Sequence, residues 1–158
     1  SGVPERIETF DISNISGKEA CGSMVSFWRG EPDKNNYRRF RIRNVHRVDD
    51  YDMMREVVRR RYGRLVKEHK LLPDLILIDG GKGHLAAALG QLKGLGLHIP
   101  IASIAKEEEK VYLPLRDHPV AFKDQSSALN LIRRMRDEAH RFAVAYHHIL
   151  RRKKVIGK

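Results

Sequence analysis

The chain has few cysteines and no long apolar runs, and each of these shortages excludes a class of protein. Its 158 residues include a single cysteine, Cys21, which excludes an internal disulfide and is typical of a reducing compartment such as the cytoplasm. Apolar runs are short, and none approaches the roughly 18 residues that a membrane-spanning helix needs. We therefore expect one globular domain over residues 1–158, with a core of its own and Cys21 packed inside it.

Acidic residues are also scarce, at 20 against 31 Lys and Arg, so the formal charge is +11. Such an imbalance favours a polyanionic partner, with nucleic acid as the leading candidate. A solubilising surface, a membrane or a ribosomal partner would be equally basic, so charge alone does not decide. We interpret Ser1-Gly2 as the remnant of a tag and residues 151–158 as the basic start of a linker, which makes the chain a domain cut from a longer protein.

The patterns that are present predict an α/β fold with a mixed sheet. Three strands are expected at Glu5 to Asp11, Gly22 to Arg29 and Tyr37 to Arg43, with a turn at Gly30 to Asn35 between the last two, as an antiparallel meander. From Asp50 the apolar residues recur every three or four positions, which predicts a helix capped by Asp49 or Asp50. The expected elements that follow are a strand at Leu75 to Asp79, a helix at Lys82 to Lys93, a strand at Ile99 to Ala105, and a long helical segment from Ser126-Ser127 to Ile149.

One segment is especially informative, the apolar run Leu75 to Ile78 that ends in Asp79 and two glycines. This is the pattern of a buried parallel strand, and ligands of open α/β sheets lie beyond the carboxyl ends of such strands. The glycines remove side-chain bulk, so a backbone, a phosphate or a hydrated metal can come close. The first predicted strand likewise ends in an acid, Asp11.

The order of elements is that of the ribonuclease H-like fold, in which these two strands lie side by side. Asp11 and Asp79 would then converge, and two converging carboxylates need a neutralising cation. Carboxylate oxygens are hard ligands that favour Mg²⁺ or Mn²⁺, so we expect a metal site that acts on a phosphate.

Several stretches carry a more specific resemblance. They are Arg6 to Ser13, Tyr37 to Ile42, Asp49 to Glu56, Arg59 to Tyr62, Pro73 to Gly83 and Arg136 to Ala143. In these stretches, and over nearly its whole length, the chain resembles the C-terminal endonuclease domain of UvrC, from bacterial nucleotide excision repair. The resemblance implies a ribonuclease H-like fold and an incision 5′ to a lesion in double-stranded DNA, made once UvrB is loaded on the damage.

Carried onto this chain, the resemblance makes Asp11 and Asp79 catalytic metal ligands and His140 the third member of the site. Asp50 corresponds to a further functional aspartate, although helix capping would also explain it. A histidine in place of more acids favours one Mg²⁺ or Mn²⁺ ion, with His140 as general base or metal ligand. His147 and His148 lack a zinc-binding spacing and are expected to be solvated.

Contacts to DNA are expected from basic residues, of which Lys82 is the best placed because it begins the helix after Asp79. The full set of candidates is Lys82, Arg38, Arg39, Lys106 and Arg136. Asp137 to His140 spells a helicase signature, but Gly80 to His84 is not the phosphate loop that an ATPase needs. The remaining alternatives are a DNA-binding or scaffolding domain without catalysis and a junction resolvase with the same acids.

Overall fold

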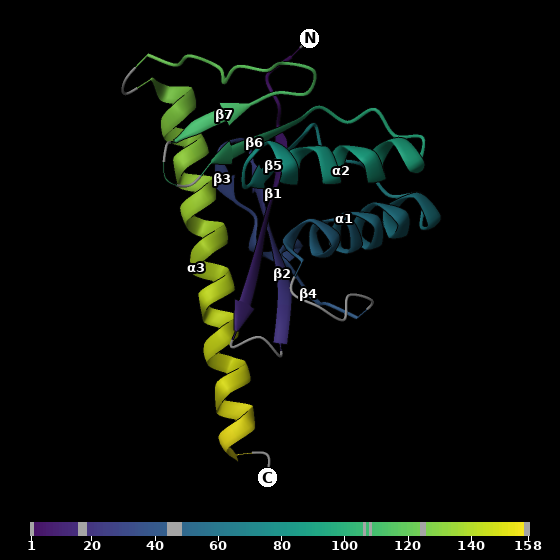
Figure 1. Cartoon of the computed structure of the whole chain (residues 1–158), viewed down its shortest axis with the longest axis vertical. Coiled ribbons are helices and arrows are strands. Elements are labelled where there is room, and N and C mark those ends of the chain that lie inside the picture. The colour runs from purple at the N-terminus through teal and green to yellow at the C-terminus, as the bar shows by residue number, and fades with distance from the viewer. Residues whose placement is uncertain are drawn as a thin grey trace.

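A seven-stranded mixed sheet forms the centre of the molecule, with helices on both faces (Figure 1). The computed structural model describes residues 2–15, 19–43, 49–105, 107, 109–123 and 126–156. The elements in chain order are β1 (Arg6–Ile15), β2 (Glu19–Trp28), β3 (Glu31–Pro32), the 3-10 turn η1 (Lys34–Asn36), β4 (Arg38–Arg41), α1 (Asp50–Lys67), β5 (Leu75–Asp79), α2 (Lys82–Gly94), β6 (Ile101–Ala105), β7 (Lys110–Tyr112) and α3 (Ser127–Ile156).

The sheet runs in the order β3-β2-β1-β5-β6-β7, and β4 also pairs with β2. β1, β2 and β4 form the antiparallel meander, while β1, β5 and β6 run parallel to one another. The predicted fold class is thereby confirmed, including the parallel pairing of β5 and β6 across helix α2. The two-residue strand β3 was not predicted.

The first strand differs from its predicted form, because β1 does not end at Asp11. It pairs with β2 as far as Ile15, whereas its parallel pairing with β5 stops at the pair Phe10 and Ile78. Asp11 therefore lies within a strand, one residue beyond the point where β5 stops pairing. The antiparallel partner holds β1 extended past that point.

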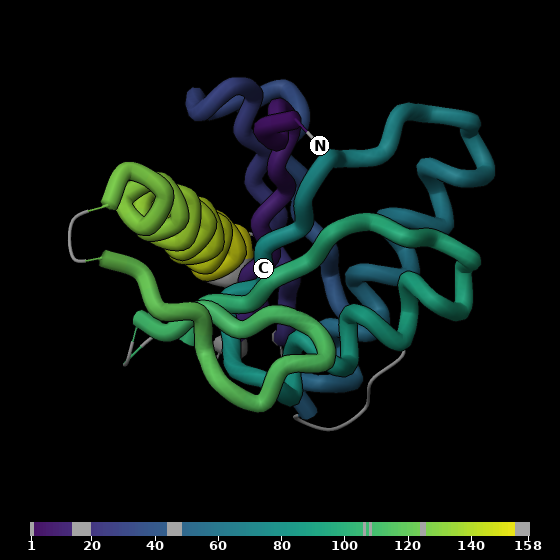
Figure 2. Tube along the Cα trace, turned by 90° about the horizontal axis from the view of Figure 1, so that it is seen from above, coloured from purple at the N-terminus to yellow at the C-terminus, as the bar shows by residue number. Residues whose placement is uncertain are grey.

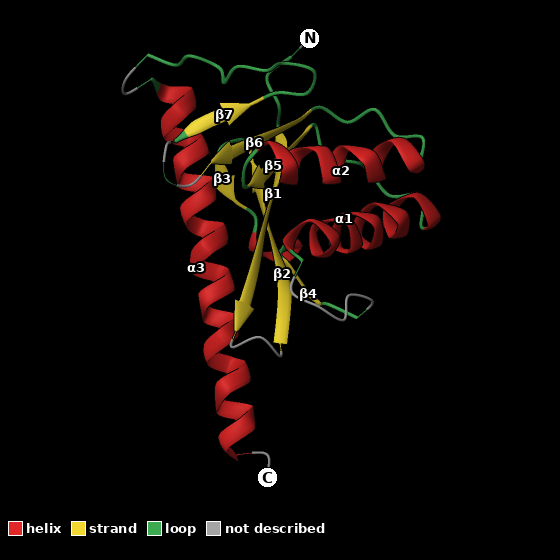
Figure 3. Ribbon diagram, viewed as in Figure 1, coloured by secondary structure: helices red, strands yellow, loops and turns green. Residues whose placement is uncertain are grey.

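Helices α1 and α2 cover one face of the sheet and α3 covers the other (Figures 2 and 3). Alternation along the strands explains the division, since Phe10 and Ile78 point toward α1 and α2 while Ile7 and Leu77 point toward α3. At Gly22 the packing is very close, because a Cβ there would lie 2.5 Å from a methyl group of Val57 in α1. Cys21 is buried, as expected.

The last predicted segment is one helix of 30 residues, α3. Ser126 precedes it, and its Oγ accepts a hydrogen bond from the amide of Leu129 at 3.2 Å, as a helix cap does. Met135 and Ala139 are buried against the sheet, but Ile149, expected in the same stripe, is 37% exposed. Residues 151–156, which the sequence assigns to the start of a linker, continue the helix. None of the helices in the described part of the chain is both long and apolar enough to cross a membrane.

Candidate active site at the ends of the parallel strands

Two carboxylates meet where the parallel pairing of β1 and β5 ends. Phe10 of β1 pairs with Ile78 of β5, and Asp11 and Asp79 each follow by one residue. Neighbouring strands lie about 4.8 Å apart, and residues in parallel register point to the same face. Both aspartates are nearly buried, with 3% and 8% of their surface exposed. The two acids, far apart in the sequence, thus lie side by side on the face that α3 covers.

A hollow of about 400 Å³ opens at this edge of the sheet. Its lining residues are Asp11, Ile12, Asp50, Asp79, Gly80, Gly81, His84, Ala105 and Glu107. Four of these are carboxylates, and none of the described lining residues is Lys or Arg. We call this site the carboxylate hollow.

Asp50 belongs to the hollow and does not cap α1. The cap is Asp49, whose carboxylate accepts hydrogen bonds from the amides of Tyr51 and Asp52 at 3.0 and 3.2 Å. Of the two capping candidates the structure therefore selects Asp49. Asp50, the first residue of α1, lines the same hollow as Asp11 and Asp79.

Two residues of the hollow, His84 and Glu107, were missed in the sequence. Glu107 follows β6, as Asp79 ends β5, so the rule that ligands gather at the carboxyl ends of parallel strands would have found it. His84 lies in the first turn of α2 and packs edge to face on Tyr51, with ring centres 4.9 Å apart. Burial lowers the pKa of the His84 imidazole, while the nearby Asp50 raises it by a smaller amount.

The glycines after Asp79 serve close packing as well as access. A Cβ on Gly80 would lie 2.5 Å from the ring of His84, and a Cβ on Gly83 would lie 2.4 Å from the ring of Tyr51. By contrast, a Cβ on Gly81 would meet nothing within 4 Å. Gly80 and Gly83 therefore let the N-terminal ends of α1 and α2 meet, and Gly81 keeps the rim of the hollow open.

His140 reaches the site from α3, on the face toward which Asp11 points. Its Nδ1 lies 3.6 Å from Oδ2 of Asp11, and its side chain is 55% exposed. One face of α3 also carries His147, which was expected to be solvated. That expectation is wrong, because Nε2 of His147 lies 2.8 Å from Oγ of Ser13, and burial lowers the pKa of its imidazole.

Of the predicted DNA contacts, Lys82 and Arg39 lie near the site. Lys82, the first residue of α2, donates to the main-chain carbonyl of Asp117, and its ammonium is 5.4 Å from the ring centre of Tyr112. Arg39 pairs in register with Ser23, which in turn pairs with Asp11, so it lies two strands from the catalytic candidates. Its guanidinium lies 4.1 Å from the ring centre of Phe142 in α3.

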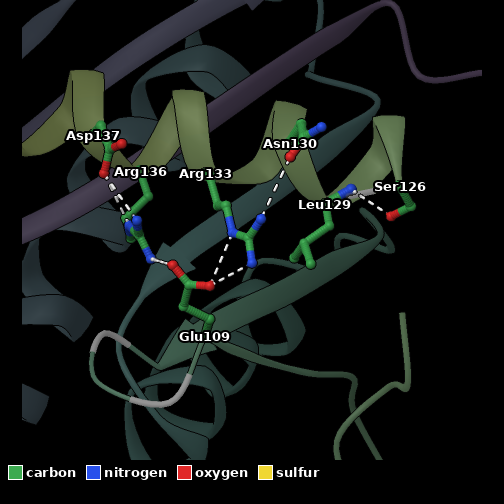
Figure 4. A network of polar contacts seen from close by, with 7 residues as sticks. All are labelled: Glu109, Ser126, Leu129, Asn130, Arg133, Arg136 and Asp137. Carbon is green, nitrogen blue, oxygen red and sulfur yellow. Dashed lines mark hydrogen bonds and ion pairs between the residues drawn. The ribbon is translucent and has the colours of Figure 1, made fainter. Parts of the chain in front are cut away.

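The other three candidates are not gathered there. Arg136 is held in a network on Glu109, which also binds Arg133 (Figure 4). Its guanidinium also donates to Asp137 of α3 at 3.0 Å, and its side chain is only 14% exposed. The contact with Glu109 joins α3 to the turn before β7. Arg38 donates to the carbonyl groups of Asn35 and Tyr37, away from the hollow. Lys106 lies outside the described residues.

The donors at this site suit a hard cation. Asp11 and Asp79 present adjacent carboxylates in a hollow that two further carboxylates line, and oxygen ligands of this kind select Mg²⁺ or Mn²⁺. Among the described residues, however, no three Asp, Glu, His or Cys side chains are close enough together to hold a metal ion. The residues therefore fit a divalent ion in their chemistry and do not form a closed cage.

Comparison with known proteins places this arrangement in a family. The chain is 49% identical to UvrABC system protein C of Methanosarcina barkeri over 99% of its length, and 50% identical to that of Methanococcus maripaludis over 97%. It spans about 30% of the length of these relatives. A solved structure, endonuclease V of Ciona intestinalis with an inosine-containing DNA, matches 66% of this chain and 48% of its own, at 14% identity and a TM-score of 0.48. A family model matches residues 1–144, and the chain accordingly belongs to the family of the UvrC RNase H endonuclease domain.

Proposed function

We propose that this domain hydrolyses a phosphodiester bond 5′ to a lesion in double-stranded DNA, in the nucleotide excision repair of the cytoplasm. The sequence has no pattern typical of a lesion-binding pocket. In this proposal, recognition of the damage therefore belongs to a complex of UvrB and DNA, which presents the damaged strand to this domain. The proposal depends on one observation above all. Asp11 and Asp79 each follow the last paired residues of β1 and β5 and line a hollow with two further carboxylates, and His140 lies beside Asp11.

Each residue then has a definite task. Asp11 and Asp79 would hold one Mg²⁺ or Mn²⁺ ion, which would supply polarisation of the scissile phosphate and stabilisation of the leaving oxygen. His140 accepts the proton of the attacking water. Its Nδ1 faces Asp11, so the carboxylate orients the ring and favours a proton on Nδ1, which leaves the lone pair on Nε2 as the base. Asp50 adds negative charge at the rim, where it attracts the cation.

Two basic residues are proposed to place the DNA strand. Lys82 begins α2, where the free amides of the first helical turn also favour a phosphate. Arg39 lies in the same row of the sheet as Asp11, and the aromatic rings of Phe142 and Tyr146 hold its guanidinium. Arg38, Arg136 and Lys106 remain candidates for contacts farther from the cleaved bond.

The test is nicking of a lesion-bearing duplex preloaded with UvrB, by a protein that keeps the flanking modules of this domain. We expect nicking with Mg²⁺ or Mn²⁺ and none with chelator, and we expect Asp79→Asn to abolish it. Asp137→Asn is the matched control, an exposed aspartate on α3 that does not line the hollow. Activity that survives Asp79→Asn refutes the catalytic assignment, and equal cutting of four-way junctions favours a resolvase.

A further inference from the structure

A second hollow, of about 440 Å³, lies at the other end of α1 from the carboxylate hollow. The C-terminal turns of α1, the start of β1, the strand β4 and the turn after α1 surround it. Its basic lining residues are Arg6, Arg38, Arg60, Arg61, Arg64 and Lys70, with one carboxylate, Glu68, on the rim. We call it the basic hollow, and the proposed catalysis uses none of it.

Part of this positive charge is neutralised by acids of the protein itself. Arg61 is buried and binds the buried carboxylate of Glu8 at 2.8 Å. Arg60 lies 3.1 Å from Glu56, while Arg64 and Lys70 share Glu68 at 2.9 and 3.2 Å. These three acids face six cations, so an excess of positive charge remains in the hollow.

The excess resides on Arg6 and Arg38, for which the described residues offer no carboxylate within ion-pair distance. The guanidinium of Arg6 lies over the ring of Trp28, 5.5 Å from its centre. One nitrogen of Arg38 donates to the carbonyl groups of Asn35 and Tyr37 at 3.0 and 2.8 Å. A guanidinium has five donors in a planar fork, so both side chains are held in place and keep donors for an anion.

The position of the basic hollow relative to the carboxylate hollow indicates which anion it suits. Asp50 begins α1 and Arg64 lies near its end, roughly 20 Å away at 1.5 Å per residue. Between the two hollows, the surface of α1 carries the exposed cation Arg59, and the exposed cations Arg64 and Lys67 follow on its last turns. A DNA duplex rises 3.4 Å per base pair, so roughly six base pairs span this distance.

We propose that the basic hollow binds the phosphodiester backbone of the DNA substrate about six base pairs from the cleaved bond. This inference depends on the proposed function, because it takes DNA as the ligand. It assigns Arg6 and Arg38 as phosphate contacts, and it makes α1 the track along which the duplex lies. The contacts are to the backbone, so they position the duplex without reading its sequence.

The experiment measures binding of this chain to a duplex oligonucleotide by fluorescence anisotropy, in chelator, over a series of salt concentrations. The variant is Arg6→Gln/Arg38→Gln, and the control is Lys93→Gln/Lys123→Gln, two exposed cations outside both hollows. Each phosphate contact contributes about 0.9 to the slope of log K against log salt, so the variant should lose about 1.8. At 0.1 M salt this corresponds to an affinity roughly 60-fold weaker.

A variant with the slope and affinity of the control overturns the proposal. If the double variant unfolds at a lower temperature than the wild type, Arg6→Gln alone gives the answer, with an expected loss of about 0.9 in slope. Because no cleavage takes place in chelator, the result is independent of the catalytic assignment. Nicking that survives Asp79→Asn refutes only the catalytic role of the carboxylate hollow. An unchanged salt slope refutes only the role of the basic hollow in DNA binding.

Discussion

The two ends of α1 show opposite arrangements of charge. At its start, the carboxylate hollow gathers Asp11, Asp50, Asp79 and Glu107, and no Lys or Arg is among its described lining residues. At its end, the basic hollow gathers six cations, four of which are within ion-pair distance of acids of the same molecule.

The difference indicates what each hollow contributes. Ion pairs such as Arg61 with Glu8 fix the structure, and the cost of breaking one falls on stability. Carboxylates placed beside one another repel, so their proximity costs stability unless a cation joins them. We therefore expect substitutions in the carboxylate hollow to change activity and substitutions under the basic hollow to change stability.

The largest effect is expected from Asp11→Asn. A metal ion supplies several kcal/mol of transition-state stabilisation, so nicking should fall by about 10³-fold or more. The free energy of unfolding should fall by less than about 1 kcal/mol or rise, because one of two adjacent like charges is removed. Nicking assays and urea unfolding check the two parts, and a strongly destabilised variant would contradict the comparison.

Glu8→Gln should have the opposite outcome. It leaves Arg61 buried without its carboxylate, which typically costs 3–5 kcal/mol, and it weakens the hydrogen bond at 2.8 Å from the hydroxyl group of Tyr62. Urea unfolding measures the loss. The matched control is Glu31→Gln, because the side chain of Glu31 is 77% exposed. This variant should change the free energy of unfolding by less than about 0.5 kcal/mol. Equal free energies of unfolding of the two variants would show that the buried pair of Arg61 and Glu8 does not stabilise the fold.

A divalent ion should stabilise the folded protein by binding in the carboxylate hollow. It should not bind in the basic hollow. At ten times its dissociation constant, Mn²⁺ should raise the free energy of unfolding by about 1.4 kcal/mol. Thermal unfolding with and without Mn²⁺ measures this shift. Glu8→Gln should keep the increment and Asp11→Asn should lose it, whereas an increment that persists in Asp11→Asn would place the ion elsewhere.

The smallest effect is expected from pH. Burial lowers the pKa of His84, so between that pKa and the ordinary value of about 6.5 the unfolded chain binds more protons than the folded one. The stability contributed by neutral His84 is full above pH 6.5 and is lost as the pH falls through this window. His84→Gln should therefore reduce the change in the free energy of unfolding between pH 7 and 5. This reduction should be smaller than the loss of stability expected for Glu8→Gln. His69→Gln, at the rim of the basic hollow, serves as control, and equal curves for wild type and His84→Gln refute the prediction.

Much of the fold was predictable because it depends on local periodicity. The apolar run Leu75 to Ile78 specifies β5, and the spacing of apolar residues specifies the long helices. The end of β1 was not predictable in this way, since Asp11 marks the end of one pairing and not of the strand. Strand length here is decided by the antiparallel partner β2, which is a tertiary effect.

The candidate site shows the same division. Asp11 and Asp79 follow from the rule on strand ends combined with the family resemblance. By contrast, Arg136 is basic in the sequence, but its charge is satisfied by Glu109, which comes from a different element. The choice of Asp49 over Asp50 as cap, and the burial of Glu8 beneath Arg61, likewise depend on contacts between distant segments.

The parallel pairing of β1 with β5 has a consequence for the time at which the chain becomes reactive. Asp11 and Asp79 approach one another only after the long intervening segment has folded back, and His140 joins them only when α3, near the end of the chain, has docked. Contacts of such high sequence separation form late in folding. A partly folded chain in which β5 and α3 have not yet docked therefore does not bring Asp11, Asp79 and His140 together.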